Sequence, residues 1–141
     1  MALTSKTILG GLYTHLTGDS TFNTAVGGTA STAGRIWFGL AKAGEAMPYC
    51  VMSEVSSGTF DTMGAAGLES RVSFQLVSDA PGGPADCVDL ADKLRVRLDN
   101  ATFTASGHEV LPAVLEDEVG PIRETDAWVL NIDYTIRALA T

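Results

Sequence analysis

The stretch from Ala127 to Ala138 alternates almost without interruption between apolar and polar side chains. Its apolar positions share one direction in an extended chain, and they are Trp128, Leu130, Ile132, Tyr134, Ile136 and Ala138. The polar positions point the other way, and they are Asn131, Asp133, Thr135 and Arg137. A period of two predicts a long strand with one face on a core and one face in water. Such strands are typical of antiparallel or mixed sheets.

Two other segments carry apolar residues at helical spacing. Residues 4–17 gather them on one face, at Ile8, Leu9, Leu12, Tyr13 and Leu16. Thr4 or Ser5 can cap the start of this helix, and Gly18 can end it. Residues 84–98 predict a second helix, with Pro84 in its first turn, acidic residues early and basic residues late, as the helix dipole favours.

The remaining extended segments are shorter or less regular. They are residues 35–40, 49–56, 68–78 and 103–115, the last interrupted at Pro112. Residues 57–67 predict a long irregular hairpin loop, in which Phe60 and Met63 have no obvious core to enter. Residues 116–118 predict an acidic turn before the closing strand.

The resulting order is helix, three strands, helix, two strands. It predicts an α+β fold of two layers, with a mostly antiparallel or mixed sheet of four or five strands packed by two helices. A length of 141 residues favours one domain over 1–141. A hydrophobic fraction of 45% with 18% charged residues indicates a globular chain rather than a disordered one.

The net charge of −8 limits the kinds of partner that the chain can bind. Binding to phosphate backbones needs clustered lysine and arginine, so a nucleic-acid-binding role is disfavoured. An acidic surface can still line a passage through which DNA slides, because repulsion prevents sticking. Acidity can also serve only to keep the protein soluble, and the sequence leaves both interpretations open.

Residues that could carry chemistry are few and scattered. Cys50 and Cys87 lie far apart and outside any Cys-x-x-Cys pair, which fits a reducing compartment and a role as small core residues. His15 and His108 have no partner at metal-ligand spacing, and three consecutive carboxylates at 116–118 cannot all converge on one ion. We therefore expect no catalytic, cofactor-binding or metal-binding residues.

Targeting and membrane signals are also missing from the pattern. The first residues contain no secretory apolar segment. No apolar run approaches the ~18 residues that a membrane-spanning helix needs.

Trp37 and Phe38 are adjacent in a predicted strand, so their side chains fall on opposite faces. One of them must point away from the core. A loop or helix of the same chain can cover it, or a neighbouring subunit can, since aromatic residues are enriched at interfaces.

Several segments, in order along the chain, resemble the small tail-completion, or tail-terminator, proteins of long-tailed double-stranded DNA phages. They are Leu12-Tyr13-x-x-Leu16-Thr17 with Asp19, Gly34-Arg35-Ile36-Trp37, Met47-Pro48-Tyr49-Cys50-Val51, Arg71–Leu76, Ala91–Arg95 with Leu98-Asp99, and Asn131–Ile136. The resemblance covers nearly the whole chain.

This resemblance implies a structural virion protein, made in the host cytoplasm, that forms a ring of commonly six subunits at the head-proximal end of a tail. The ring would end tube polymerisation, contact tail-tube and neck proteins, and let DNA pass without sequence-specific binding. The candidate interface residues are then Trp37, Phe38, Phe60, Met63, Asn131, Asp133 and Arg137. The candidate lumen residues are Glu116, Asp117 and Glu118.

Other functions remain open at the level of sequence. A neighbouring neck or connector ring component would show much the same pattern. A non-viral dimeric domain that binds a small molecule would need a closed apolar pocket with converging polar groups. A hydrolase would need a histidine or carboxylate pair, which the sequence does not supply.

Overall fold

The computed structural model describes residues 4–18, 20–29, 31–39, 46–62, 65–99, 101, 103–105, 108–124 and 126–139. The helical elements there are α1 (Ser5–Thr17), α2 (Ser20–Ala25), the 3-10 turn η1 (Ala80–Gly82) and α3 (Pro84–Leu98). The strands are β1 (Ile36–Phe38), β2 (Tyr49–Thr62), β3 (Ala65–Asp79), β4 (Phe103–Ala105), β5 (His108–Val110), β6 (Val114–Glu124) and β7 (Ala127–Leu139).

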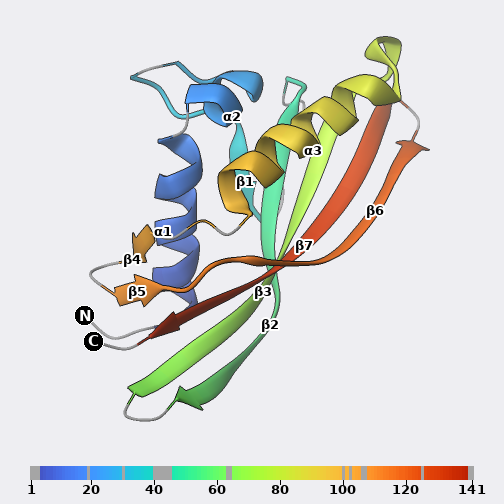
Figure 1. The fold of residues 1–141 in the computed structure, drawn as a ribbon. Coiled ribbons are helices and arrows are strands. Elements are labelled where there is room, and N and C mark those ends of the chain that lie inside the picture. Colours follow the sequence, from blue (N-terminus) through green and yellow to red (C-terminus); the bar gives the residue numbers. More distant parts are fainter. Residues whose placement is uncertain are drawn as a thin grey trace.

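The strands form one mixed sheet whose centre is β7, the long alternating strand of the sequence (Figure 1). The order is β1-β2-β3-β7-β5-β4, and β6 also pairs with β7, along the stretch next to the one that β5 uses. β1 and β2 are parallel, and the other neighbours are antiparallel. The α+β class is confirmed. The prediction of four or five strands is wrong, because the described residues contain seven.

Helices α1 and α3 pack on one face of this sheet (Figure 1). Strand residues of that face are fully or almost fully buried, and they are Cys50, Met52, Val72, Phe74, Leu76, Leu130, Ile132, Tyr134 and Ile136. The helices cover them with Ile8, Leu12, Leu16, Cys87, Leu90, Leu94 and Leu98. Both predicted helices are confirmed, and α2 lies against α1 and α3.

Two segments that the sequence suggested to be irregular are strand in the structure. Residues 57–62 continue β2, and residues 65–67 begin β3, so the hairpin is paired up to Thr62 and Ala65. The acidic residues 116–118 lie within β6 and not in a turn. Both predictions failed for the same reason: backbone pairing to a neighbouring strand holds these segments, and pairing needs no alternating side chains.

Gly11 allows α1 to approach β4 closely. A Cβ added there would stand 2.6 Å from the Cβ of Ala105 and 3.0 Å from its Cα. The neighbouring Gly10 is exposed, and a Cβ added at that position would meet no atom within 4 Å. The two glycines therefore have different effects on stability, although both weaken the helix by about 1 kcal/mol relative to alanine.

We expect Gly11→Ala to lower the free energy of unfolding by about 1–2 kcal/mol, because overpacking of 1–3 kcal/mol outweighs the gain in helix propensity. The matched control Gly10→Ala should raise it by about 0.5–1 kcal/mol. Urea unfolding of the two variants measures both values. Equal stabilisation by the two substitutions would mean that β4 does not press on α1.

Candidate interaction surfaces

The sheet has a second face that no described helix covers, and register assigns residues to it. Asn131, Asp133 and Arg137 lie there, since they alternate with the buried Leu130, Ile132, Tyr134 and Ile136. Asp133 accepts a hydrogen bond from Arg71 across the β3–β7 pair at 3.1 Å, and Arg137 donates to Glu69 at 2.6 Å. These two predicted interface residues thus form ion pairs within the chain.

The other half of the uncovered face is apolar. Val51, Val77 and Val129 are only 4–6% exposed. Ile122 lies opposite Val129 in the register, and Val119 lies opposite Asn131. Both of these β6 side chains are about half exposed, at 51% and 48%. The three valines are thus already covered within the subunit, whereas Val119 and Ile122 of the edge strand are apolar positions that a partner can cover.

The paired aromatics of β1 point in opposite directions, as predicted. Phe38 is 50% exposed, and its ring lies 5.5 Å from that of Tyr13 on the helical side. Trp37 is half-buried opposite Val51, on the uncovered face. Its Nε1 is buried and makes no hydrogen bond within the described residues. Both rings remain partly accessible, so each can still contact a partner.

The three acidic residues of β6 do not converge. Glu116 accepts a hydrogen bond from the Thr135 hydroxyl at 2.8 Å. Asp117 lies opposite Asp133, whereas Glu118 forms an ion pair with Arg95 of α3, on the helical side. The carboxylates thus fall on two faces of the sheet. Within the described residues, no group of three or more His, Cys, Asp or Glu side chains could hold a metal ion.

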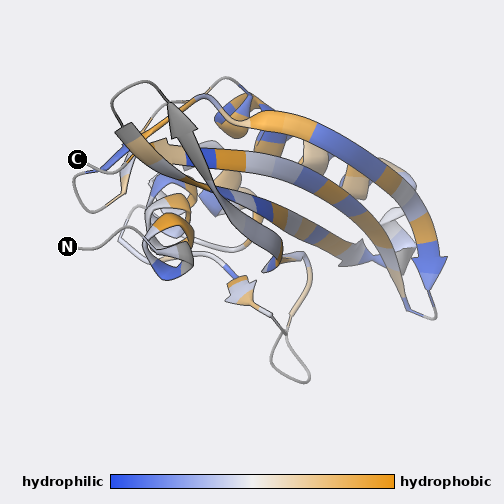
Figure 2. Cartoon of the chain, turned by 90° about the horizontal axis from the view of Figure 1, so that it is seen from below, coloured by the Kyte–Doolittle hydropathy of each residue, from blue (hydrophilic) through white to orange (hydrophobic). Residues whose placement is uncertain are grey.

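β6 is the surface that sequence reasoning missed. Of its apolar residues, four are 42–51% exposed, namely Val114, Leu115, Val119 and Ile122. Figure 2 shows them as orange positions on both sides of the blue acidic stretch of this strand. These apolar positions were the sequence feature that could have indicated a strand. The acidic run and Gly120-Pro121 interrupt them, and for this reason the segment resembled a turn.

The predicted contact residues of the hairpin are only partly placed. Met63 lies outside the described residues. Phe60 belongs to β2, where its backbone is the register partner of Gly67. The β2 residues before it, from Val55 to Thr59, are exposed.

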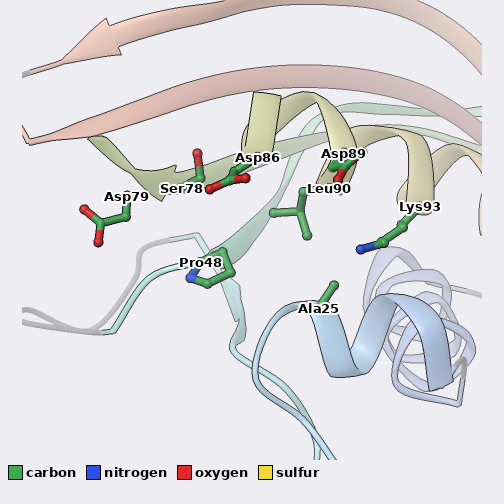
Figure 3. Close-up of a pocket in the computed structure, with 8 residues that line it drawn as sticks. All are labelled: Ala25, Pro48, Ser78, Asp79, Asp86, Asp89, Leu90 and Lys93. Carbon is green, nitrogen blue, oxygen red and sulfur yellow. The ribbon is translucent and has the colours of Figure 1, made fainter. Parts of the chain in front are cut away.

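An open cleft of about 210 Å³ lies between α2, the end of β3 and the first half of α3 (Figure 3). Its walls are formed by Ala25, Pro48, Ser78, Asp79, Asp86, Asp89, Leu90 and Lys93. A second hollow, of about 450 Å³, is lined by Lys6, Leu9, Gly10 and Phe38. The first is small with a largely charged rim, and the second has an apolar wall with a single charge. Neither combines enclosure with converging polar groups, as small-molecule sites do.

Both cysteines are buried, and His15 makes packing and backbone contacts. Cys50 and Cys87 are buried, as predicted, and burial raises the pKa of both thiols above their ordinary value. The His15 ring stacks on Phe103 with centroids 4.6 Å apart, and its Nε2 lies 3.1 Å from the Arg97 carbonyl oxygen. Arg97 in turn donates to the His15 carbonyl. These contacts tie α1 to the end of α3.

Helices that could cross a membrane are not found: among the described residues, none is both long and apolar enough.

Comparisons with known proteins agree with the fold. A family model described as "Tail completion protein gp17" matches residues 10–139. A solved chain from the "Virion of native gene transfer agent (GTA) particle" is 14% identical with a TM-score of 0.73, over 99% of this chain and 100% of that one. A second solved chain is 13% identical with a TM-score of 0.67, over 99% and 98%. At such identities the structures establish a shared fold. No curated protein matches the sequence.

Proposed function

Because the chain belongs to the tail completion protein gp17 family, we propose that it is a structural virion protein at the head-proximal end of a phage tail. Copies of it form a ring, commonly of six subunits, that ends polymerisation of the tail tube and joins the tail to the head or neck. The observation that carries this proposal is the family match over residues 10–139, which spans nearly the whole fold.

The surfaces of the subunit are compatible with a ring. A ring needs two different patches on each subunit, because its contacts are heterologous. The edge strand β6 offers exposed apolar side chains of the kind that a partner covers, at Val114, Leu115, Val119 and Ile122. Trp37, Phe38 and the end of the β2–β3 hairpin, with Phe60 and Met63, are the candidate contacts to neighbouring subunits, tube or neck.

The charge of the subunit is more compatible with a channel through which DNA passes than with DNA binding. With a net charge of −8, a ring of several copies repels phosphate. We place Glu116 and Asp117 of β6 toward the lumen, on the uncovered side of the sheet that also carries Asn131 and Asp133. DNA would then slide through without sequence-specific contacts.

The test has two parts. Native mass spectrometry of the purified protein should show a closed oligomer rather than a monomer. Cryo-electron microscopy of assembled particles should place that ring between tail tube and neck. A ring located only within the neck would indicate a connector component, and a monomer absent from particles would contradict the proposed function.

A further inference from the structure

The sheet has two open edges of similar length. On one side, β6 pairs with β7 through residues 114–124, and its other edge pairs with no described strand. On the other side, β1 pairs only with Cys50–Met52 of β2. From Ser53 to Thr62, β2 therefore has no described partner on the edge away from β3. Unpaired backbone donors and acceptors along such edges can be satisfied by another strand.

The directions of the strands determine how two copies can join. β2, β3, β7 and β6 are neighbours in this order and alternate in direction, since each pair is antiparallel. A rotation about a ring axis keeps the sense of every strand along that axis in the next copy, also when the strands are tilted from it as in closed sheets. β6 of one copy would then meet β2 of the next in antiparallel orientation. The alternation would continue across the junction.

We propose that successive subunits of the ring are joined by β-sheet pairing between β6 of one copy and residues 53–62 of β2 of the next. This inference rests on the proposed function and names the two surfaces that the ring uses. On β6 the paired stretch is Val114–Val119, because Pro121 has no backbone N–H to donate.

The register within one copy gives the offset at the junction. Val114 lies level with Ser56, and Val119 with Val51, through their partners on β7 and β3. To lie opposite the middle of the open residues 53–62 of the next copy, residues 114–119 of β6 must be shifted along β2 by about four residues, or roughly 14 Å. This shift accumulates over the four strands of one copy, which together are about 19 Å wide. This corresponds to a strand tilt of about 36°, within the roughly 35–45° of closed sheets.

The side chains of both edges permit this contact. Natural edge strands are often protected from pairing by lysine, and neither β6 nor residues 53–62 contains one. Val55 is 58% exposed on β2, and Val119 is 48% exposed on β6. Acidic residues occur on both edges, at Glu54 and Asp61 of β2 and at positions 116–118 of β6, so their repulsion opposes the junction. Added salt should therefore strengthen the ring.

Cysteine cross-linking tests the junction. The single variants Val55→Cys and Val119→Cys each carry one accessible thiol, because the native Cys50 and Cys87 are buried. A short bis-maleimide should give a covalent dimer when the two variants are mixed, and little when either is alone. The control Val96→Cys is 85% exposed on α3, which is neither of the two edge strands, and should cross-link far less with Val55→Cys than Val119→Cys does.

The outcomes separate this inference from the proposed function. A dimer from Val119→Cys alone would indicate an isologous β6–β6 contact and overturn the proposal. Rings seen by native mass spectrometry without cross-linking in the mixture would overturn the β6–β2 junction and leave the ring intact. Absence of any oligomer would overturn both. Circular dichroism of each variant verifies that the fold is retained.

Discussion

Raising the pH from 8 to 11 should lower the free energy of unfolding by about 4 kcal/mol, a large part of the roughly 5–15 kcal/mol that stabilises a typical domain. Two groups on the covered face of the sheet account for this amount, and the raised pKa of the Cys87 thiol adds to the loss. Burial raises the pKa of the Cys50 thiol far above its ordinary value. Burial also raises the pKa of Tyr134, and its hydrogen bond to the negatively charged Asp99, 2.6 Å long, raises it further.

The sign of the effect follows from proton binding. Both groups keep their protons longer in the folded state, so the stability they contribute is fully present below their unfolded-state pKa values. Above those values, near 9 for cysteine and 10 for tyrosine, the unfolded chain releases protons and gains stability. Each group then costs the fold about 1.4 kcal/mol per pH unit, up to its own raised pKa.

Guanidinium unfolding at pH 8, 9.5 and 11 measures this slope. The variants Cys50→Ala and Tyr134→Phe should each reduce the slope by about 1.4 kcal/mol per pH unit above the relevant pKa. Tyr134→Phe should also cost about 1.5–3 kcal/mol at pH 8, because it removes a hydrogen bond to a charged group. An unchanged slope in both variants would show that neither group stays protonated in the folded state.

Shortening the β2–β3 hairpin should weaken the assembly and leave the subunit folded. Thr59 and Leu68 are register partners, so an Asn-Gly turn can join them in place of residues 60–67. The strand residues just before the cut, from Val55 to Thr59, are exposed. We expect a loss of about 1–2 kcal/mol in stability, because the deleted residues also include the buried Gly67, whose backbone is the register partner of Leu139. The ring should be weakened, because the variant lacks residue 60 of β2, which the proposed offset places opposite Val114, and the edge ends there.

Thermal unfolding and native mass spectrometry of the same preparation separate the two effects. A full-length control, Phe60→Ser with Met63→Ser, keeps the backbone and changes only the apolar side chains. Rings in this control but not in the shortened variant would assign the contact to the backbone edge. Unfolding of the shortened variant would contradict the prediction, because it would show that the end of the hairpin supports the core.

A sequence pattern predicts a helix or strand well when one of its faces is buried and the other is exposed to solvent. β7 lies between a helical layer and an open face, so its side chains must alternate, and its bounds were predicted to within one residue. β6 is an edge strand whose exposed side chains have no such constraint, so its residues 116–118 were interpreted as a turn and its first two residues as the end of the extended segment 103–115. The tip-proximal parts of β2 and β3 were missed for the same reason.

Contacts between distant strands limit what can be predicted about the candidate surfaces. Asp133 and Arg137 were correctly placed on the uncovered face, but their partners Arg71 and Glu69 are set by the β3–β7 register. A sequence pattern gives the face of a residue and not the residue opposite it. Similarly, the pairing of Glu118 with Arg95 depends on how α3 lies over β6.

The central position of β7 has a consequence for biosynthesis. The strands on either side of it, β3 and the β5–β6 stretch, precede it in the chain, so the middle of the sheet is synthesised after its flanks. A nascent or truncated chain that lacks β7 has no strand to connect β3 with β6. Incomplete products therefore cannot present both edges in one rigid body, and they lack the arrangement on which the proposed β6–β2 junction depends.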